Sequence, residues 1–279
     1  MAADEPYFRE AGAGPGVVCL HSNASSSSQW RGLIDRLSPR YHVLAADAYG
    51  AGRSPALPAD RTLQLDDEVS LLVPVLARAG RPFALVGHSY GGAVAAIAAL
   101  RHRADVRALA LYEPTLFALL DEEKPPPNDA DGIRAAVARS VAALAAADPD
   151  AASGHFIDYW MGPGTWAGLP DGRRAPITAA IVNVAGWGHA LFGDTTRLRQ
   201  FADLDIPVLC MVGARSPASS LAVARRLTQR LPNVELVTFD DLGHMGPVTD
   251  PDRVNETIAR FLERTIGGRV DRANAADVR

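Results

Sequence analysis

Short apolar runs alternate along the chain with segments of helical periodicity, and this alternation limits the fold more than any other feature. The apolar character of each run is continuous, which predicts strands buried on both faces, as in a parallel sheet. Glycine, proline or aspartate bounds most of the runs, as expected for strands. The predicted strands are residues 17–20, 41–46, 83–86, 106–111, 208–212 and 234–239.

Helical patterns fall between these strands. Two of them follow a capping side chain and a proline, at Ser216-Pro217 and Asp250-Pro251, which predicts where those helices begin. Such alternation is typical of right-handed crossovers around a mainly parallel sheet. We therefore predict an α/β fold with a mostly parallel sheet flanked by helices. The predicted helices are residues 29–37, 65–79, 91–101, 221–231 and 254–266.

The stretch from residue 115 to residue 201 breaks the alternation. It has a proline-rich turn at 125–128 and an alanine-rich helical pattern at 132–147, and it holds three of the four tryptophans. We interpret it as an inserted helical cap, with residues 1–114 and 202–279 forming the core. Most of its aromatic side chains are expected to form the core of the cap, and Phe117, Trp160 and Trp187 are the candidates for lining a substrate pocket.

Composition and charge exclude several classes of protein. The formal net charge is −4 without a basic block, so a nucleic-acid partner is not expected. Residues 1–10 contain no apolar signal-peptide region, and no apolar run approaches the roughly 20 residues that span a membrane.

Cys19 and Cys210 lie in strand-like runs, which favours buried, reduced thiols in a cytoplasmic protein. The polar tail, residues 267–279, is expected to fray, and homo-oligomerisation stays open.

A serine stands in the motif GHSYGG at residues 87–92, between a predicted strand and a predicted helix. A nucleophile elbow needs this context, because small residues let strand and helix approach around a strained serine. We therefore predict Ser89 as a nucleophile. A serine hydroxyl needs a base, and His244 lies in a loop beyond the last predicted strand. His88, inside the motif, is expected to support the turn.

An oxyanion hole needs backbone N–H groups directed at the developing negative charge. The N–H of Tyr90, directly after the serine, is the first predicted donor. The loop after the first predicted strand supplies the other, and we assign the N–H of Asn23, with Ser22 as the second choice.

Four segments together resemble the α/β-hydrolase family. They are His21-Ser22-Asn23, residues 87–92, Gly243-His244 with Pro247, and the glycine-containing loop at 47–54. The resemblance covers nearly the whole chain outside residues 115–201. It implies the α/β-hydrolase fold, a catalytic Ser–His–acid triad, and no metal or organic cofactor.

The chain departs from the family pattern at the triad acid. Many relatives carry aspartate at the position where this chain has Ser216. Ser216 follows the predicted strand 208–212. Some members, haloalkane dehalogenases among them, carry the acid one strand earlier, and after the predicted strand 106–111 this chain has Glu113. We therefore predict Glu113 as the acid, and a Ser–His pair without an acid remains an alternative. A second departure is Ser22, where many relatives have glycine.

These features predict a serine hydrolase that cleaves a small apolar ester or lactone through an acyl-enzyme on Ser89. Carbon–carbon bond hydrolases and cofactor-free haloperoxidases share the Ser–His arrangement and stay open as alternatives. Dehalogenases and epoxide hydrolases need a carboxylate nucleophile, so Ser89 argues against them. The missing aspartate keeps a second class open, a catalytically silent member of the fold that binds a small molecule.

Overall fold

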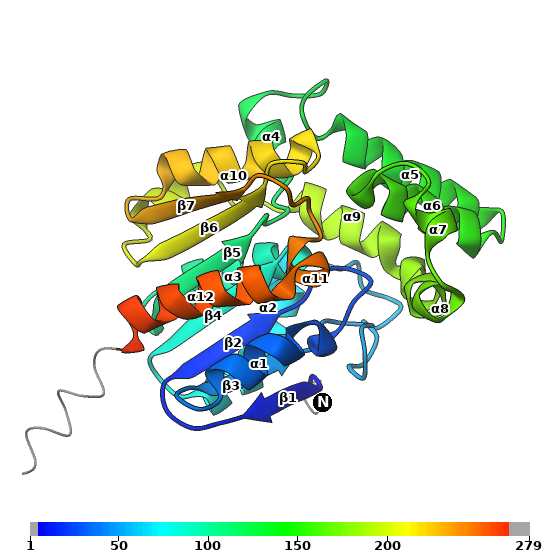
Figure 1. Cartoon of the computed structure of the whole chain (residues 1–279). Helices are drawn as coiled ribbons and strands as arrows, with labels where there is room; N and C mark the ends of the chain where they lie inside the picture. Colours follow the sequence, from blue (N-terminus) through cyan, green and yellow to red (C-terminus); the bar gives the residue numbers. More distant parts are fainter. Residues whose placement is uncertain (1–4, 268–279) are drawn as a thin grey trace, which may run out of the picture.

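A computed structural model describes residues 5–267, and a twisted sheet runs through its centre (Figure 1). Within these residues the sheet has seven strands in the order β1-β3-β2-β4-β5-β6-β7. β1 is antiparallel to β3, and the other pairs are parallel. The predicted fold class is confirmed. The strands are β1 (Phe8–Ala11), β2 (Gly16–Leu20), β3 (His42–Ala46), β4 (Phe83–His88), β5 (Val106–Tyr112), β6 (Val208–Gly213) and β7 (Val234–Phe239).

The outer strands depart from the sequence prediction. β1 was not predicted, because its sequence FREA mixes charged and apolar residues and it is only partly buried at the sheet edge. β7 was predicted to be buried on both faces, and this is wrong. It is the other edge strand, and the side chain of Leu236 is 52% exposed. Each of the other predicted strands matches an observed strand.

Helices cover both faces of the sheet (Figure 1). Residues of α1 and α12 share one hydrophobic core, and residues of α2, α3 and α10 contribute to the core on the opposite face. In α12, Val254, Ile258, Phe261 and Leu262 fall on one side of the helix and are buried, which explains the predicted periodicity. The flanking elements are η1 (Ser27–Trp30), α1 (Arg31–Leu37), α2 (Leu65–Ala79), α3 (Tyr90–Arg101), α10 (Ala218–Arg230), α11 (Gly246–Thr249) and α12 (Pro251–Thr265).

Residues 113–207 connect β5 to β6 and contain only helices and loops. Most of their helices lie together at one end of the sheet, apart from the layers that cover its faces (Figure 1). We call residues 118–193 the inserted helices. They and the following turn are α4 (Ala118–Glu123), α5 (Asp131–Ala145), α6 (Pro149–Met161), α7 (Thr165–Gly168), α8 (Asp171–Ala180), η2 (Ile181–Asn183), α9 (Val184–Gly193) and η3 (Leu198–Asp203).

One helical stretch, Asp171–Gly193, is long and apolar enough to cross a membrane by length and composition. This corrects the expectation that no part of the chain reaches that length. The stretch comprises α8, η2 and α9, and its residues Val184, Ala190 and Leu191 belong to the hydrophobic core. A core helix of a folded domain meets the same criterion, so the stretch is weak evidence for a membrane span.

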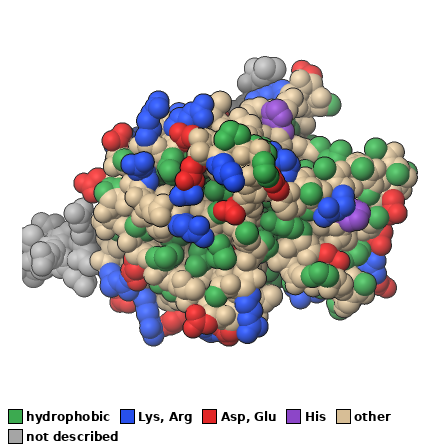
Figure 2. Space-filling view, turned by 90° about the horizontal axis from the view of Figure 1, so that it is seen from above, with side chains coloured by type: hydrophobic (Ala, Val, Ile, Leu, Met, Phe, Trp, Pro, Cys, Tyr) green, Lys and Arg blue, Asp and Glu red, His purple; other side chains and the backbone are tan. Residues whose placement is uncertain are grey.

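Charged side chains of both signs are interspersed on the surface. The view from above shows Lys and Arg among Asp and Glu, without a large field of one sign (Figure 2). Many of them pair, as Arg253 does with Asp241 at 2.8 Å. Exposed pairs of this kind contribute little to stability.

The close approach of β4 to α3 leads to a prediction about stability. A Cβ on Gly87 would lie 2.4 Å from the carbonyl oxygen of Gly91 and 2.7 Å from Cα of Gly92. These are backbone atoms that cannot give way, so Gly87→Ala is expected to lower the free energy of unfolding by roughly 1–3 kcal/mol. Gly172 in α8 has nothing within 4 Å of such a Cβ and is the matched control. Gly172→Ala should be neutral or stabilise by up to roughly 1 kcal/mol, measured by denaturant unfolding. Equal effects of the two substitutions would contradict this account.

Candidate active site

Ser89 lies on the sharp turn that joins β4 to α3. Its φ is 55°, in the left-handed region that a residue other than glycine enters at a cost of about 1–3 kcal/mol. The turn is held because the N–H of Ser89 donates to the carbonyl of Tyr112, and the N–H of Gly91 donates to the carbonyl of His21. A Cβ on Gly91 would lie 2.4 Å from the carbonyl oxygens of Leu20 and His21, so glycine is required there. The strand–turn–helix setting predicted for Ser89 is present.

His244 meets Ser89 from a loop that follows β7. Its Nε2 lies 2.8 Å from Oγ of Ser89, and its ring is almost fully buried. Its Nδ1 lies 2.7 Å from Oε2 of Glu113. These partners suit the tautomer in which Nδ1–H donates to the carboxylate and Nε2 accepts from the serine hydroxyl. The structure therefore brings together the three side chains that the sequence analysis selected.

Glu113 lies at the end of β5 and is fully buried. Its Oε1 accepts from the N–H of Gly213 at 2.7 Å and from the hydroxyl of Ser216 at 2.5 Å, while Oε2 accepts from His244. Such donors compensate a carboxylate for the water it loses on burial. A Ser–His pair without an acid does not fit this arrangement.

Ser216 stands where many relatives carry the acid, and here its hydroxyl donates to the acid instead. The prediction that its side chain caps the following helix is therefore wrong, and α10 begins at Ala218 without a side-chain cap. Asp250 does cap α12, because it accepts from the N–H of Arg253. Asp240 and Asp241, the carboxylates nearest to His244 in sequence, are exposed.

A chain of hydrogen bonds links the loop after β2 to His244. Oε1 of Gln29 accepts from both the N–H and the hydroxyl of Ser22, and Nε2 of Gln29 donates to Nδ1 of His88. Nε2–H of His88 then donates to the carbonyl of His244. Burial lowers the pKa of His88 well below its usual range, which keeps the ring neutral in this role. His88 thus supports the turn, as predicted.

The same bonds correct one oxyanion prediction. The N–H of Ser22 is already donated to Gln29, so Ser22 is not free to serve as a donor to an oxyanion. Asn23 lines a cavity together with Ser89, and Tyr90 begins α3. The first N–H groups of a helix have no partner within the helix. The backbone of Asn23 and Tyr90 therefore remains the candidate pair.

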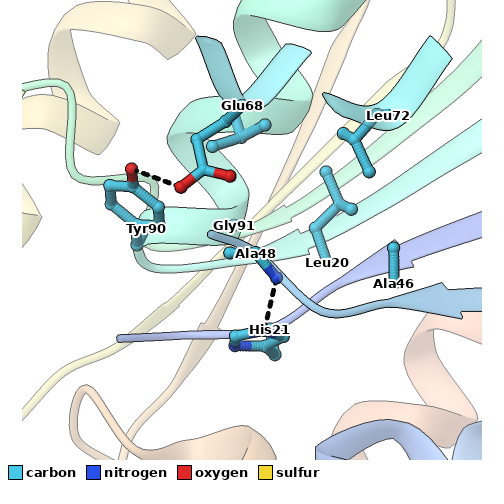
Figure 3. Close-up of a pocket in the computed structure, with 9 residues that line it drawn as sticks. Leu20, His21, Ala46, Ala48, Glu68, Leu72, Tyr90 and Gly91 are labelled. Atoms are coloured by element: carbon cyan, nitrogen blue, oxygen red, sulfur yellow. Dashed lines mark hydrogen bonds between the residues drawn. The ribbon is translucent and has the colours of Figure 1, made fainter. Parts of the chain in front are cut away.

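Behind the turn, Tyr90 contacts a buried carboxylate that the sequence analysis missed (Figure 3). Its hydroxyl donates to Oε1 of Glu68 at 2.9 Å, and Oε2 of Glu68 accepts from the N–H of Tyr49 at 3.1 Å. Burial raises the pKa of Glu68 to about 7. One sequence signal could have revealed it: Glu68 stands on the apolar face of α2, three residues after Leu65.

The cavity that Ser89 and Asn23 line is mostly apolar. The structure places Phe117, Trp160 and Trp187, the three predicted pocket residues, in its lining. The space open to the centre of a water molecule is about 10 Å³, about what one water needs. The ring of Trp160 also stacks on that of His244, with the centroids 3.9 Å apart. The cavity therefore has little free space beside Ser89.

Comparison with known proteins agrees with this geometry. Residues 15–251 match the family model of the alpha/beta hydrolase fold. The chain belongs to the α/β hydrolase family. Among its described residues, Ser89 directly follows β4, Glu113 directly follows β5 and His244 lies in the loop after β7, and all three are buried.

Relatives of this α/β hydrolase include named enzymes. It is 23% identical to the (E)-2-((N-methylformamido)methylene)succinate hydrolase of Acinetobacter baylyi, over 93% of this chain and 94% of that one. It is 29% identical to the lipase LipV of Mycobacterium tuberculosis, over 94% and 99%. An alpha/beta hydrolase from Sphaerobacter thermophilus aligns with a TM-score of 0.72 and 26% identity, over 92% and 96%. These relatives support the prediction of a serine hydrolase of this fold.

The raised pKa of Glu68 makes stability depend on pH. Between pH 4.5, the ordinary value for glutamate, and about 7, the unfolded chain releases this proton while the folded chain keeps it. Stability from this group is therefore complete below pH 4.5 and falls by about 3 kcal/mol as the pH rises through 7. In Glu68→Gln this loss should disappear. The free energy of unfolding of the variant minus that of the wild type should therefore be larger at pH 8 than at pH 4.5. Denaturant unfolding at several pH values measures the difference, with Glu5→Gln, at an exposed carboxylate, as control. An unchanged pH slope in Glu68→Gln would contradict the assignment.

Proposed function

We propose that this α/β hydrolase cleaves small, apolar carboxylic esters or lactones through an acyl-enzyme on Ser89. One observation carries the proposal: Ser89, His244 and Glu113 form a continuous buried hydrogen-bonded chain. A serine hydroxyl is a weak nucleophile until a base removes its proton, and a carboxylate behind that base stabilises the imidazolium.

Acylation begins when Oγ of Ser89 attacks the carbonyl carbon of the substrate. Nε2 of His244 accepts the serine proton across the 2.8 Å hydrogen bond, and Glu113 balances the positive charge that develops on the ring. The tetrahedral intermediate then collapses, and Nε2–H of His244 protonates the departing alcohol oxygen. In a lactone the alcohol stays attached to the acyl group.

Deacylation repeats the sequence with water. His244 takes a proton from the water that attacks the acyl carbon, and Ser89 leaves with that proton restored to Oγ. In both steps the backbone N–H groups of Tyr90 and Asn23 donate to the carbonyl oxygen when it becomes negative. The N-terminus of α3, which begins at Tyr90, favours that charge as well.

We further propose that the segment 115–201 acts as a cap over the site. It contributes α6 and α9, whose aromatic side chains line the cavity at Ser89. Because the free space admits about one water, a substrate can bind only when these helices or the ring of Trp160 move. The apolar lining favours apolar acyl groups. A relative named as a lipase adds support for ester substrates.

The structure bears differently on the alternative functions, a silent binder on one side and a carbon–carbon hydrolase or haloperoxidase on the other. A catalytically silent binder was suggested by the missing aspartate, and Glu113 occupies the acid's place beside His244. Carbon–carbon hydrolysis and halide oxidation need the same Ser–His contact, so substrate tests decide among them. A panel of p-nitrophenyl esters of increasing chain length, run beside lactones, is the direct test.

A fluorophosphonate probe is expected to label Ser89, because it forms a covalent adduct only with a serine activated by a base. The wild type should be labelled and Ser89→Ala should not, as measured by mass spectrometry of the intact protein. Ser54→Ala is the control. The hydroxyl of Ser54 donates to the carbonyl of Asp47, away from the triad, so this variant should be labelled like the wild type. Absence of labelling in folded wild-type protein would remove the catalytic proposal.

Glu113→Gln is expected to lower kcat by roughly 10³–10⁴-fold, because an amide cannot stabilise the imidazolium and favours the wrong tautomer. Esterase assays measure the loss, and circular dichroism checks that the variant folds. Asp241→Asn, at an exposed carboxylate near His244 in sequence, is the matched control and should keep activity. If Glu113→Gln retained wild-type turnover, another group would have to be the acid.

A further inference from the structure

Two residues that line the cavity at Ser89 each have a buried polar atom without a hydrogen-bond partner among the described residues. Oγ1 of Thr115 and Oδ1 of Asn23 are both buried, and neither has a hydrogen-bond partner among residues 5–267. Both residues line the cavity, and the side chain of Thr115 is almost fully buried. Buried polar groups are nearly always paired, so two in one cavity need an explanation.

None of the other lining side chains hydrogen-bonds to either atom. Apart from Ser89 and the two orphaned residues the lining is aliphatic or aromatic, and no lysine, arginine or carboxylate belongs to it. The remaining lining residues are Phe117, Ile133, Val137, Phe156, Trp160, Trp187, Gly188, Leu191 and Phe192.

The two orphaned residues follow strands on either side of the strand that leads to the nucleophile. Asn23 follows β2 and Thr115 follows β5, and these strands flank β4, which leads into Ser89. The N–H of Thr115 donates to the carbonyl of Ser89 at 3.3 Å, so the two residues are direct neighbours. The inserted helices supply most of the remaining lining, which is apolar or aromatic.

We propose that Thr115 and Asn23 form a subsite for a hydroxyl group on the acyl part of the substrate, close to the carbonyl that Ser89 attacks. This inference rests on the proposed function and narrows it to esters of hydroxylated acids whose remainder is apolar or aromatic. The hydroxyl of such an acid donates to Oδ1 of Asn23 and accepts from Oγ1–H of Thr115, which satisfies both groups at once.

Other groups fit the subsite less well. A methyl or methylene group leaves both polar atoms unsatisfied. A carboxylate finds no cation in the lining and faces the oxygen of Asn23. A site built to bind a hydroxyl discriminates strongly against the analogue without it, because its own polar groups are then left unpaired.

The experiment compares esters that differ only by one hydroxyl. The pairs are methyl mandelate with methyl phenylacetate, and methyl 3-hydroxy-3-phenylpropanoate with methyl 3-phenylpropanoate. In at least one pair, kcat/KM of the wild type should favour the hydroxylated ester at least tenfold. Thr115→Val keeps the shape of the side chain and removes the hydroxyl, and it should bring that ratio close to 1. Thr115→Ser keeps the hydroxyl and should preserve the ratio.

Using a ratio separates recognition of the hydroxyl from any general loss of activity. Equal kcat/KM values within both pairs in the wild type would overturn the inference, and so would a preference that Thr115→Val leaves intact. Thermal unfolding checks that both variants fold.

A binding measurement keeps the inference separate from the proposed chemistry. Ser89→Ala should bind the hydroxylated methyl ester of the preferred pair at least fivefold more tightly than its partner by calorimetry, and adding Thr115→Val should remove the difference. If the wild type neither reacts with the fluorophosphonate nor hydrolyses any ester, the proposed function fails, and these binding ratios still decide whether the subsite exists. Equal affinities for both members of both pairs would then refute it.

Discussion

The site depends on the hydrogen bonds that the buried carboxylate of Glu113 accepts. It accepts hydrogen bonds from the N–H of Gly213, the hydroxyl of Ser216 and the ring of His244. These donors come from the end of β6, the turn before α10 and the loop after β7, so one side chain joins three segments. Removing any one donor would leave a buried charge less well satisfied, which links the position of the base to the packing of the sheet edge.

Serine at position 216 becomes understandable from this arrangement. When the acid stands at the end of β5, the position usually held by an aspartate is free to supply a donor, and Ser216 does so at 2.5 Å. Ser22 follows the same logic in the loop after β2. Its N–H and hydroxyl both donate to Gln29. Gln29 in turn donates to His88, and His88 donates to the carbonyl of His244. Both departures from the family pattern therefore have hydrogen-bonding roles.

The inserted helices give this site its apolar character. Trp160 stacks on His244, and Phe117 packs against Trp160 and Phe192 over the cavity. Excluding water strengthens the electrostatic interactions around the Ser–His contact. Unpaired polar atoms are costly in such surroundings, and among the described residues Oγ1 of Thr115 and Oδ1 of Asn23 are unpaired.

The sequence alone determined the features that follow from local patterns. Continuous apolar runs identified the inner strands, and the glycines around Ser89 identified a turn that only small residues permit. It also selected His244, because a loop histidine after the last strand can reach the same sheet edge. Patterns that mix polar and apolar residues, as in β1, carried too little signal to predict a strand.

Only the tertiary structure decided how those groups are supported. Glu113 and His244 lie 131 positions apart in the sequence, and Gln29 and His88 lie 59 apart. Such contacts depend on strand order and on the loops that meet at one edge, which no local pattern encodes. The same holds for the buried Glu68 and for the unpaired atoms of Thr115 and Asn23. Composition and spacing can place a polar residue near a site, but only packing decides whether its hydrogen bonds are satisfied.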